Sequence, residues 1–231
     1  MAREPERTFA ILPVKRFVAA KARLGDELSG GTRRALTEAM VTDVLMALRR
    51  TKAVHEVLLV TSDPAAEAIG RGYGARVLHD GAEAGQSAAA QIGIAHALEA
   101  GATRVLLVPG DCPALAPAEL EALLDGPPLG RAVTIVADRH GTGTNALVLT
   151  PPDVIEPAFG PGSRERHEQA AAAAGVPCSV EGVPTLALDV DTADDLAVLR
   201  QALAERRGGA AHTRGMLSRL AGWGRSPAGG P

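Results

Sequence analysis

The sequence predicts an α/β fold: one domain built as a three-layer sandwich, in which helices cover both faces of a mostly parallel, mixed sheet. Short apolar segments typical of buried strands alternate along the chain with segments whose apolar residues recur at helical spacing. The chain has 231 residues, enough for one domain, and 46% of them are hydrophobic. Only 2% are aromatic, so the core must consist mainly of Ala, Val, Leu and Ile.

The elements of the first half follow from these two patterns. Residues 8–14 form a short apolar run typical of a strand, and a helix is then predicted by the spacing of Leu36, Met40, Val44 and Leu48. The same patterns predict strands over 55–61, 75–79 and 103–108, and helices over 64–72 and 86–100. Strands that alternate with helices in this way favour a parallel sheet.

The second half is predicted to add a hairpin, a last strand and further helices. Helices are expected over 117–124 and 163–174, and strands over 132–137 and 145–150. A turn over 138–144 joins these two strands, so we expect a hairpin at the edge of the sheet. Residues 186–190 are predicted to form the last central strand. Thr192 then caps a final helix, and acidic residues occupy its first turn.

We expect the folded domain to span residues 8–207. Residues 1–7 are polar and are predicted to be a flexible N-terminus, and 208–231 are predicted to be a disordered tail because they are poor in apolar residues. The formal net charge of -3 gives no footprint for nucleic acid, and no apolar run reaches the roughly 20 residues of a membrane span. Cys112 and Cys178 lack a CxxC partner. We therefore expect a cytoplasmic protein with no nucleic-acid or membrane partner.

Acidic side chains stand where two strands are predicted to end. Asp111 follows the strand over 103–108, and Asp189 and Asp191 lie two residues apart near the end of the strand over 186–190. Side chains two apart on a strand share one face, and ligands collect at the carboxyl ends of parallel strands. Mg²⁺ prefers carboxylate oxygens. The pattern predicts one Mg²⁺ site, although a turn and a helix cap would explain Asp111 and Asp191 singly.

A basic loop follows the first strand, where α/β nucleotide-binding proteins hold phosphates. It contains Lys15, Arg16, Lys21 and Arg23, more cations than a connector requires, although solvated surface charge is the usual explanation of such a cluster. A bound triphosphate would account for all four. The loop lacks the GxxxxGK[ST] pattern, so a P-loop fold is not expected.

Two loops rich in Gly and hydroxyl residues are further candidates for anion binding. Residues 141–145 read Gly-Thr-Gly-Thr-Asn, and 159–163 read Phe-Gly-Pro-Gly-Ser, with Ser163 at a predicted helix start. Arg164, Arg166 and His167 are expected to add positive charge beside them. A tight turn and an ordinary helix cap would explain the same residues without a ligand.

Taken together and in order, these motifs resemble the guanylyltransferases of deazaflavin coenzyme (factor 420) biosynthesis. The resemblance runs over about residues 8–203 and rests on Pro13-Val-Lys15, Ala20-Lys-Ala-Arg-Leu24, Pro109-Gly-Asp-Cys-Pro113, Gly141-Thr-Gly-Thr-Asn-Ala-Leu147, Phe159-Gly-Pro-Gly-Ser163 and Leu188-Asp-Val-Asp-Thr192. It implies a GT-A-like, Rossmannoid nucleotidyltransferase fold. It also implies transfer of GMP from GTP to a phosphorylated three-carbon acid, with release of pyrophosphate.

The resemblance also implies a role for each matching residue. Lys15 and Asp111 would be catalytic; Lys15, Arg16, Lys21 and Arg23 would contact the nucleotide; Asp111, Asp189 and Asp191 would hold Mg²⁺; and Thr144, Gly160 and Ser163 would bind the acceptor. Gln86 and Ser87 occupy the place of the guanine loop, with His79 and Asp80 before it. Residues 85–89 read Gly-Gln-Ser-Ala-Ala, where the family typically has a Gly-Leu-Asn-like sequence.

Several alternatives stay open at the level of the sequence. The family's acceptors are phosphoenolpyruvate, 2-phospholactate and 3-phosphoglycerate, and a composition typical of a high-GC bacterium favours phosphoenolpyruvate. A downstream transferase that consumes the product and a second copy of the chain, as a homodimer, are the protein partners considered. A molybdopterin or sugar nucleotidyltransferase would need a Gly-rich first loop, which is missing. A GTP-binding module without catalytic activity is the remaining alternative.

Overall fold

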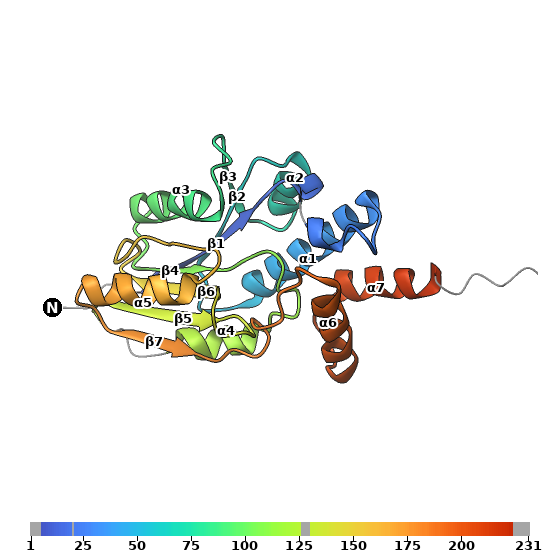
Figure 1. The fold of residues 1–231 in the computed structure, drawn as a ribbon. Helices are drawn as coiled ribbons and strands as arrows, with labels where there is room; N and C mark the ends of the chain where they lie inside the picture. Colours follow the sequence, from blue (N-terminus) through green and yellow to red (C-terminus); the bar gives the residue numbers. More distant parts are fainter. Residues whose placement is uncertain (1–5, 20, 126–129, 224–231) are drawn as a thin grey trace, which may run out of the picture.

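The computed structural model describes residues 6–19, 21–125 and 130–223 and contains a seven-stranded sheet (Figure 1). The strands are β1 (Thr8–Val14), β2 (Glu56–Thr61), β3 (Arg76–His79), β4 (Arg104–Leu107), β5 (Ala132–Ala137), β6 (Thr144–Thr150) and β7 (Cys178–Glu181). Their order is β3-β2-β1-β4-β6-β5-β7, and only β6 runs antiparallel to its neighbours among these strands. The predicted α/β fold with a mostly parallel, mixed sheet is confirmed.

Helices cover both faces of the sheet, as the pattern of β1 requires. Ala10 and Leu12 point into one buried cluster, and Phe9 and Ile11 into another, because successive side chains of a strand face opposite sides. The first cluster is covered by α1 (Gly30–Arg50), α2 (Pro64–Gly72) and α4 (Pro117–Leu124), and the second by α3 (Gln86–Glu99) and α5 (Ser163–Ala173). These three layers form the predicted sandwich.

A third apolar cluster joins the start of α1 to two further helices, α6 (Ala193–Glu205) and α7 (Ala211–Trp223). Both helices lie beyond the sheet, on the side where β1 ends (Figure 1). The prediction of a disordered tail over 208–231 is therefore wrong for the described part, to residue 223; residues 224–231 lie outside it. The Asp43 carboxylate of α1 accepts hydrogen bonds from the backbone amides of His212 and Thr213 and so caps α7. Met216 and Leu217 are buried.

The predicted last central strand over 186–190 is also wrong. Strand β4 already pairs with β1 on one side and β6 on the other, so no free edge remains beside it. Residues 186–190 instead form an irregular segment, and the strand that precedes α6 is β7 at the sheet edge. The predicted hairpin is confirmed as β5 and β6, but it lies inside the sheet because β7 covers it.

The start of the chain is held against the sheet more firmly than predicted. Residues 1–5 lie outside the described part, but Arg7 donates to the carbonyl of Ala100 and its guanidinium covers the ring of Phe9. The flexible N-terminus expected over 1–7 is therefore wrong for residue 7. Within the described residues, no helix is long and apolar enough to cross a bilayer.

Candidate functional site

Asp111 and the irregular segment 186–191 meet where β4 ends. The backbone amide of Val190 donates to the carbonyl of Asp111 over 3.1 Å, and the buried thiol of Cys112 faces the carbonyl of Leu186. Burial raises the pKa of Cys112 well above its usual value, so this thiol stays protonated and can donate. Hydrogen bonds from β4's end therefore replace the missing strand pairing and fix the segment that carries Asp189 and Asp191.

Lys21 lies between two of the predicted metal-binding carboxylates. Its Nζ is 2.5 Å from Asp111 Oδ2 and 2.9 Å from Asp191 Oδ1, and its side chain is 7% exposed. Burial alone lowers the pKa of Lys21, but the two carboxylates outweigh it and the pKa ends above its ordinary value. The sequence placed Lys21 in the nucleotide site, and the structure places its ammonium in the carboxylate cluster.

Asp189 has a different partner. The side-chain amide of Asn145, at the start of β6, donates to Asp189 Oδ1 over 2.9 Å and to the carbonyl of Leu186 over 2.7 Å. Burial raises the pKa of Asp189, and the nearby charges of Asp111 and Asp191 add to this effect. Sequence reasoning assigned no role to Asn145, although its position directly after Thr144 was a usable signal.

The three carboxylates suit a divalent cation, but they are not arranged as a finished site. Within the described residues, no three Asp, Glu, His or Cys side chains already form a group that could hold a metal ion. The Lys21 ammonium nevertheless shows that Asp111 and Asp191 direct one oxygen each toward a shared positive charge. Hard carboxylate oxygens of this kind are the ligands that Mg²⁺ takes. The donor atoms therefore fit this ion, which would have to displace the Lys21 ammonium from them.

A cleft of about 520 Å³ extends from Asp111 and Asp191 along the carboxyl ends of the strands, and Asp189 is not among the residues that line it. Lys15 and Arg16 line it from the loop after β1, and Gln86 lines it from the start of α3. Arg16 also forms an exposed ion pair with Glu83. The amino end of a helix favours anions. The loop cations and the start of α3 therefore both favour a negatively charged ligand in this cleft.

Two predicted nucleotide-binding residues lie elsewhere. Arg23 is exposed in the short helix η2 (Ala22–Leu24), which follows η1 (Phe17–Ala19), and it is not among the residues that line the cleft. Ser87 accepts a hydrogen bond from the backbone amide of Phe159, so it fastens the start of α3 to the loop before α5. Its observed contact is structural, and it links the cleft to the predicted acceptor loops.

The structure brings the predicted acceptor residues together. The amide of Arg164 donates to the carbonyl of Thr142, which joins the start of α5 to the turn before β6. Gly160 has a φ of 111°, a conformation that favours glycine. Ser163 is the first residue of α5, and its Oγ is buried without a hydrogen-bond partner among the described residues. A buried unpaired hydroxyl is costly, so this position suits a ligand.

The expected positive charge beside these loops is wrong for His167. Its side chain is completely buried, and burial together with the charge of Arg166 lowers its pKa to about 4. Arg166 donates to the backbone carbonyls of Ala158, Phe159 and Pro161. Arg164 bonds to Glu168 and to the carbonyl of Gly141. The two arginines thus hold the loops in place.

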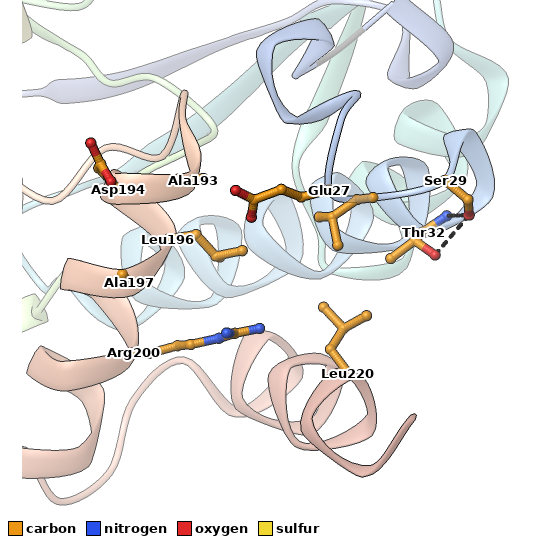
Figure 2. Close-up of a pocket in the computed structure, with 10 residues that line it drawn as sticks. Glu27, Ser29, Thr32, Ala193, Asp194, Leu196, Ala197, Arg200 and Leu220 are labelled. Atoms are coloured by element: carbon orange, nitrogen blue, oxygen red, sulfur yellow. Dashed lines mark hydrogen bonds between the residues drawn. The ribbon is translucent and has the colours of Figure 1, made fainter. Parts of the chain in front are cut away.

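A second hollow, of about 640 Å³, lies between the start of α1, α6 and α7 (Figure 2). Glu27 points from the loop before α1 toward α6, and Arg200 extends from α6 toward α7 and Leu220 (Figure 2). None of the predicted site residues lines this hollow. The cleft beside the carboxylates is therefore the candidate site.

Comparison with known proteins identifies the family of this chain. A model of the family described as "Guanylyl transferase CofC like" matches residues 8–217. The chain belongs to this guanylyl transferase family. One relative, the phosphoenolpyruvate guanylyltransferase of Conexibacter woesei, is 56% identical over 214 residues, which is 92% of this chain and 96% of that protein. The chain is thus a nucleotidyltransferase of the CofC-like family, as the motifs predicted.

Solved structures resemble this guanylyl transferase family member in fold. A protein from Desulfovibrio desulfuricans G20 named as a nucleotide-diphospho-sugar transferase has a TM-score of 0.72 at 16% identity, covering 94% of this chain and 96% of that one. A protein of Mycobacterium tuberculosis H37Rv in complex with manganese has a TM-score of 0.53 at 21% identity, covering 85% and 98%. These likenesses extend to the sheet and its helices and support the nucleotidyltransferase fold.

Proposed function

We propose that this protein transfers GMP from GTP to phosphoenolpyruvate and releases pyrophosphate, as a step in making the deazaflavin coenzyme. The structural observation that carries the proposal is the contact between Asn145 and Asp189, because it joins the predicted acceptor loop to the carboxylate cluster. An enzyme that joins two phosphorylated molecules needs both bound side by side. The name of the 56% identical relative supports both the reaction and the acceptor.

In this proposal GTP lies in the cleft, with its triphosphate toward the carboxylates. Lys15 and Arg16 face the cleft from the loop after β1, where their charge can meet the phosphates. Lys21 lines the same cleft beside Asp111, and a triphosphate would offer its ammonium new partners. Fixed cations near the leaving pyrophosphate stabilise the charge that develops in the transition state.

Asp111, Asp189 and Asp191 would hold Mg²⁺. The ion, when bound, would polarise the phosphoryl oxygens as a Lewis acid and orient the triphosphate. Asn145 holds Asp189 in place for this role, and the amide of Val190 ties the segment to Asp111. A manganese complex of a protein with the same fold supports a divalent ion in general, and the hard oxygen ligands support Mg²⁺.

The chain's own residues then account for the transfer. Thr144, Gly160 and Ser163 would bind the acceptor, one of whose phosphate oxygens attacks the α-phosphorus of GTP. The bond between this phosphorus and the bridging oxygen breaks, and pyrophosphate leaves with that oxygen. A phosphate monoester has its second pKa near ~6, so at pH 7 it is largely ionised and needs no general base. The neutral, buried His167 is consistent with a site that positions the acceptor without deprotonating it.

The proposal is tested by mixing the protein with GTP and Mg²⁺ and supplying phosphoenolpyruvate, 2-phospholactate and 3-phosphoglycerate separately. Pyrophosphate release and the mass of the product are measured, with the downstream transferase and its deazaflavin substrate present in parallel because the product is expected to be unstable. We expect product with phosphoenolpyruvate. Product only with another acceptor would correct the substrate, and binding of GTP without any product would support a non-catalytic module instead.

A further inference from the structure

The imidazole of His167 is completely buried between the two predicted acceptor loops. Its Nδ1 lies 3.0 Å from Thr144 Oγ1, at the start of β6. Its Nε2 lies 2.8 Å from the backbone nitrogen of Ala158, just before the Gly-Pro-Gly loop. The ring of Phe159 packs edge-on against it, with centroids 5.4 Å apart. Both nitrogens of this side chain are therefore committed to named partners.

These two contacts fix the proton on the ring. A backbone amide can only donate, so the hydrogen bond from Ala158 requires a bare Nε2. A neutral imidazole with a bare Nε2 carries its proton on Nδ1, so His167 must donate to Thr144 Oγ1. The low pKa of His167, about 4, agrees with a neutral ring.

The direction of this bond determines what the Thr144 hydroxyl can do. Because Thr144 Oγ1 accepts from His167, its own hydrogen must point to another acceptor. Thr144 is nearly buried, and its hydroxyl has no second partner among the described residues. The unpaired hydroxyl of Ser163, on the same helix as His167, also lacks an acceptor. Anionic oxygens would satisfy both hydroxyls.

We propose that His167 is a positioning residue for the acceptor, because it turns the Thr144 hydroxyl into a hydrogen-bond donor toward an oxygen of the phosphorylated acid. His167 touches neither the acceptor nor the nucleotide in this proposal and acts only through Thr144. The identity of the acceptor rests on the proposed function. The assigned tautomer and the direction of the hydrogen bond rest on the contacts of His167 alone.

Two substitutions separate this role from simple support of the loop. In His167→Gln the side-chain oxygen can replace Nε2 as acceptor for Ala158, but the donor at Nδ1 is lost. In His167→Asn the side-chain amide can replace the Nδ1 donor, but the acceptor for Ala158 is lost. We expect His167→Gln to raise the KM for the acceptor by roughly tenfold, with the KM for GTP unchanged, because a hydrogen bond to a charged group is lost. His167→Asn should stay closer to wild type in acceptor KM, and His96→Gln on α3 is the matched control.

A double-mutant cycle with Thr144→Val tests whether His167 acts through Thr144. Adding His167→Gln to Thr144→Val should change the acceptor KM little, since the hydroxyl is already gone. Long-range ¹H–¹⁵N NMR of the wild-type protein should show His167 protonated at Nδ1 only. The proposal would be overturned by a proton on Nε2 or by an equal rise in acceptor KM in the Gln and Asn variants. Fully additive changes of acceptor KM in the cycle would also overturn it. Wild-type protein without turnover on any acceptor would instead contradict the proposed function, and the NMR result would stand apart from it.

Discussion

Lys21 Nζ lies 2.5 Å from Asp111 Oδ2, where both residues line the cleft, and it also contacts Asp191. Lys21 has a φ of 57°, which is uncommon for a residue with a side chain, and this backbone conformation is part of how the loop delivers its ammonium to the carboxylates. The positive charge that these carboxylates need is thus supplied by the chain itself. A divalent cation at these carboxylates would have to compete with it.

Lys21→Met should therefore strengthen metal binding and weaken catalysis. Without the ammonium, Asp111 and Asp191 repel each other, and we expect Mn²⁺ to bind roughly tenfold more tightly in the absence of nucleotide, equivalent to about 1.4 kcal/mol. Turnover should fall, because a cation near the phosphates is lost. Calorimetry of Mn²⁺ binding checks the first effect, with the exposed Arg50→Met as a control for charge. Equal Mn²⁺ affinity in wild type and Lys21→Met would contradict the competition.

Asp111→Asn and Asp189→Asn should each lower turnover by orders of magnitude, because each removes a charged ligand from the predicted metal site. Neither change should unfold the protein, since an amide has nearly the same size as the carboxylate. Initial rates of pyrophosphate release, compared with thermal unfolding, separate the two effects. The exposed Asp153→Asn serves as the control. Full activity in both site variants would rule out the metal assignment.

Asp43→Ala should destabilise the protein by roughly 1–2 kcal/mol, because the amides of His212 and Thr213 would lose their cap. Urea unfolding measures the change, and Asp153→Ala controls for loss of a surface carboxylate. Truncation after residue 209 should destabilise it further, since Met216 and Leu217 are buried against α1 and α6. An unchanged unfolding midpoint in both variants would show that α7 does not contribute to the stability of the domain.

The low pKa of His167 predicts a pH dependence of stability. Its pKa is about 4 in the folded protein against an ordinary 6.5, so between these values the unfolded chain binds a proton that the folded protein excludes. The contribution of His167 is therefore present above pH 6.5 and is lost as the pH falls toward 4. In His167→Gln, the free energy of unfolding should lack the part of the decrease between pH 6.5 and pH 4 that His167 causes. Urea titrations of both proteins from pH 7 to pH 4 test it, and parallel curves would contradict the assignment.

Local patterns were enough to predict most of the elements that carry the site. The apolar run over 8–14 and the spacing of Leu36, Met40, Val44 and Leu48 gave β1 and α1, and Asp111 was expected where β4 ends. These features depend on residues close together in the chain. The strand predicted over 145–150 is confirmed as β6, which begins one residue earlier, at Thr144.

The features that were missed depend on partners far away in the sequence. The apolar residues 186–190 resemble a strand, but β6 already occupies the position beside β4. Helix α7 is stabilised by Asp43, about 170 residues before it, so its composition alone did not reveal it. The partners of Lys21 and the buried, neutral state of His167 were hidden for the same reason.

In the proposed function, the carboxylate cluster and the acceptor loops form one guanylyl transfer site. This claim is tested most directly by a crystal structure with Mn²⁺, phosphoenolpyruvate and a GTP analogue whose α–β bridge cannot be cleaved, with manganese located by its anomalous scattering. We predict manganese on Asp111, Asp189 and Asp191, with Lys21 moved to the phosphates and the acceptor against Thr144 and Ser163. Manganese or nucleotide bound away from these carboxylates, or an acceptor distant from the α-phosphorus, would rule out a single transfer site of this kind.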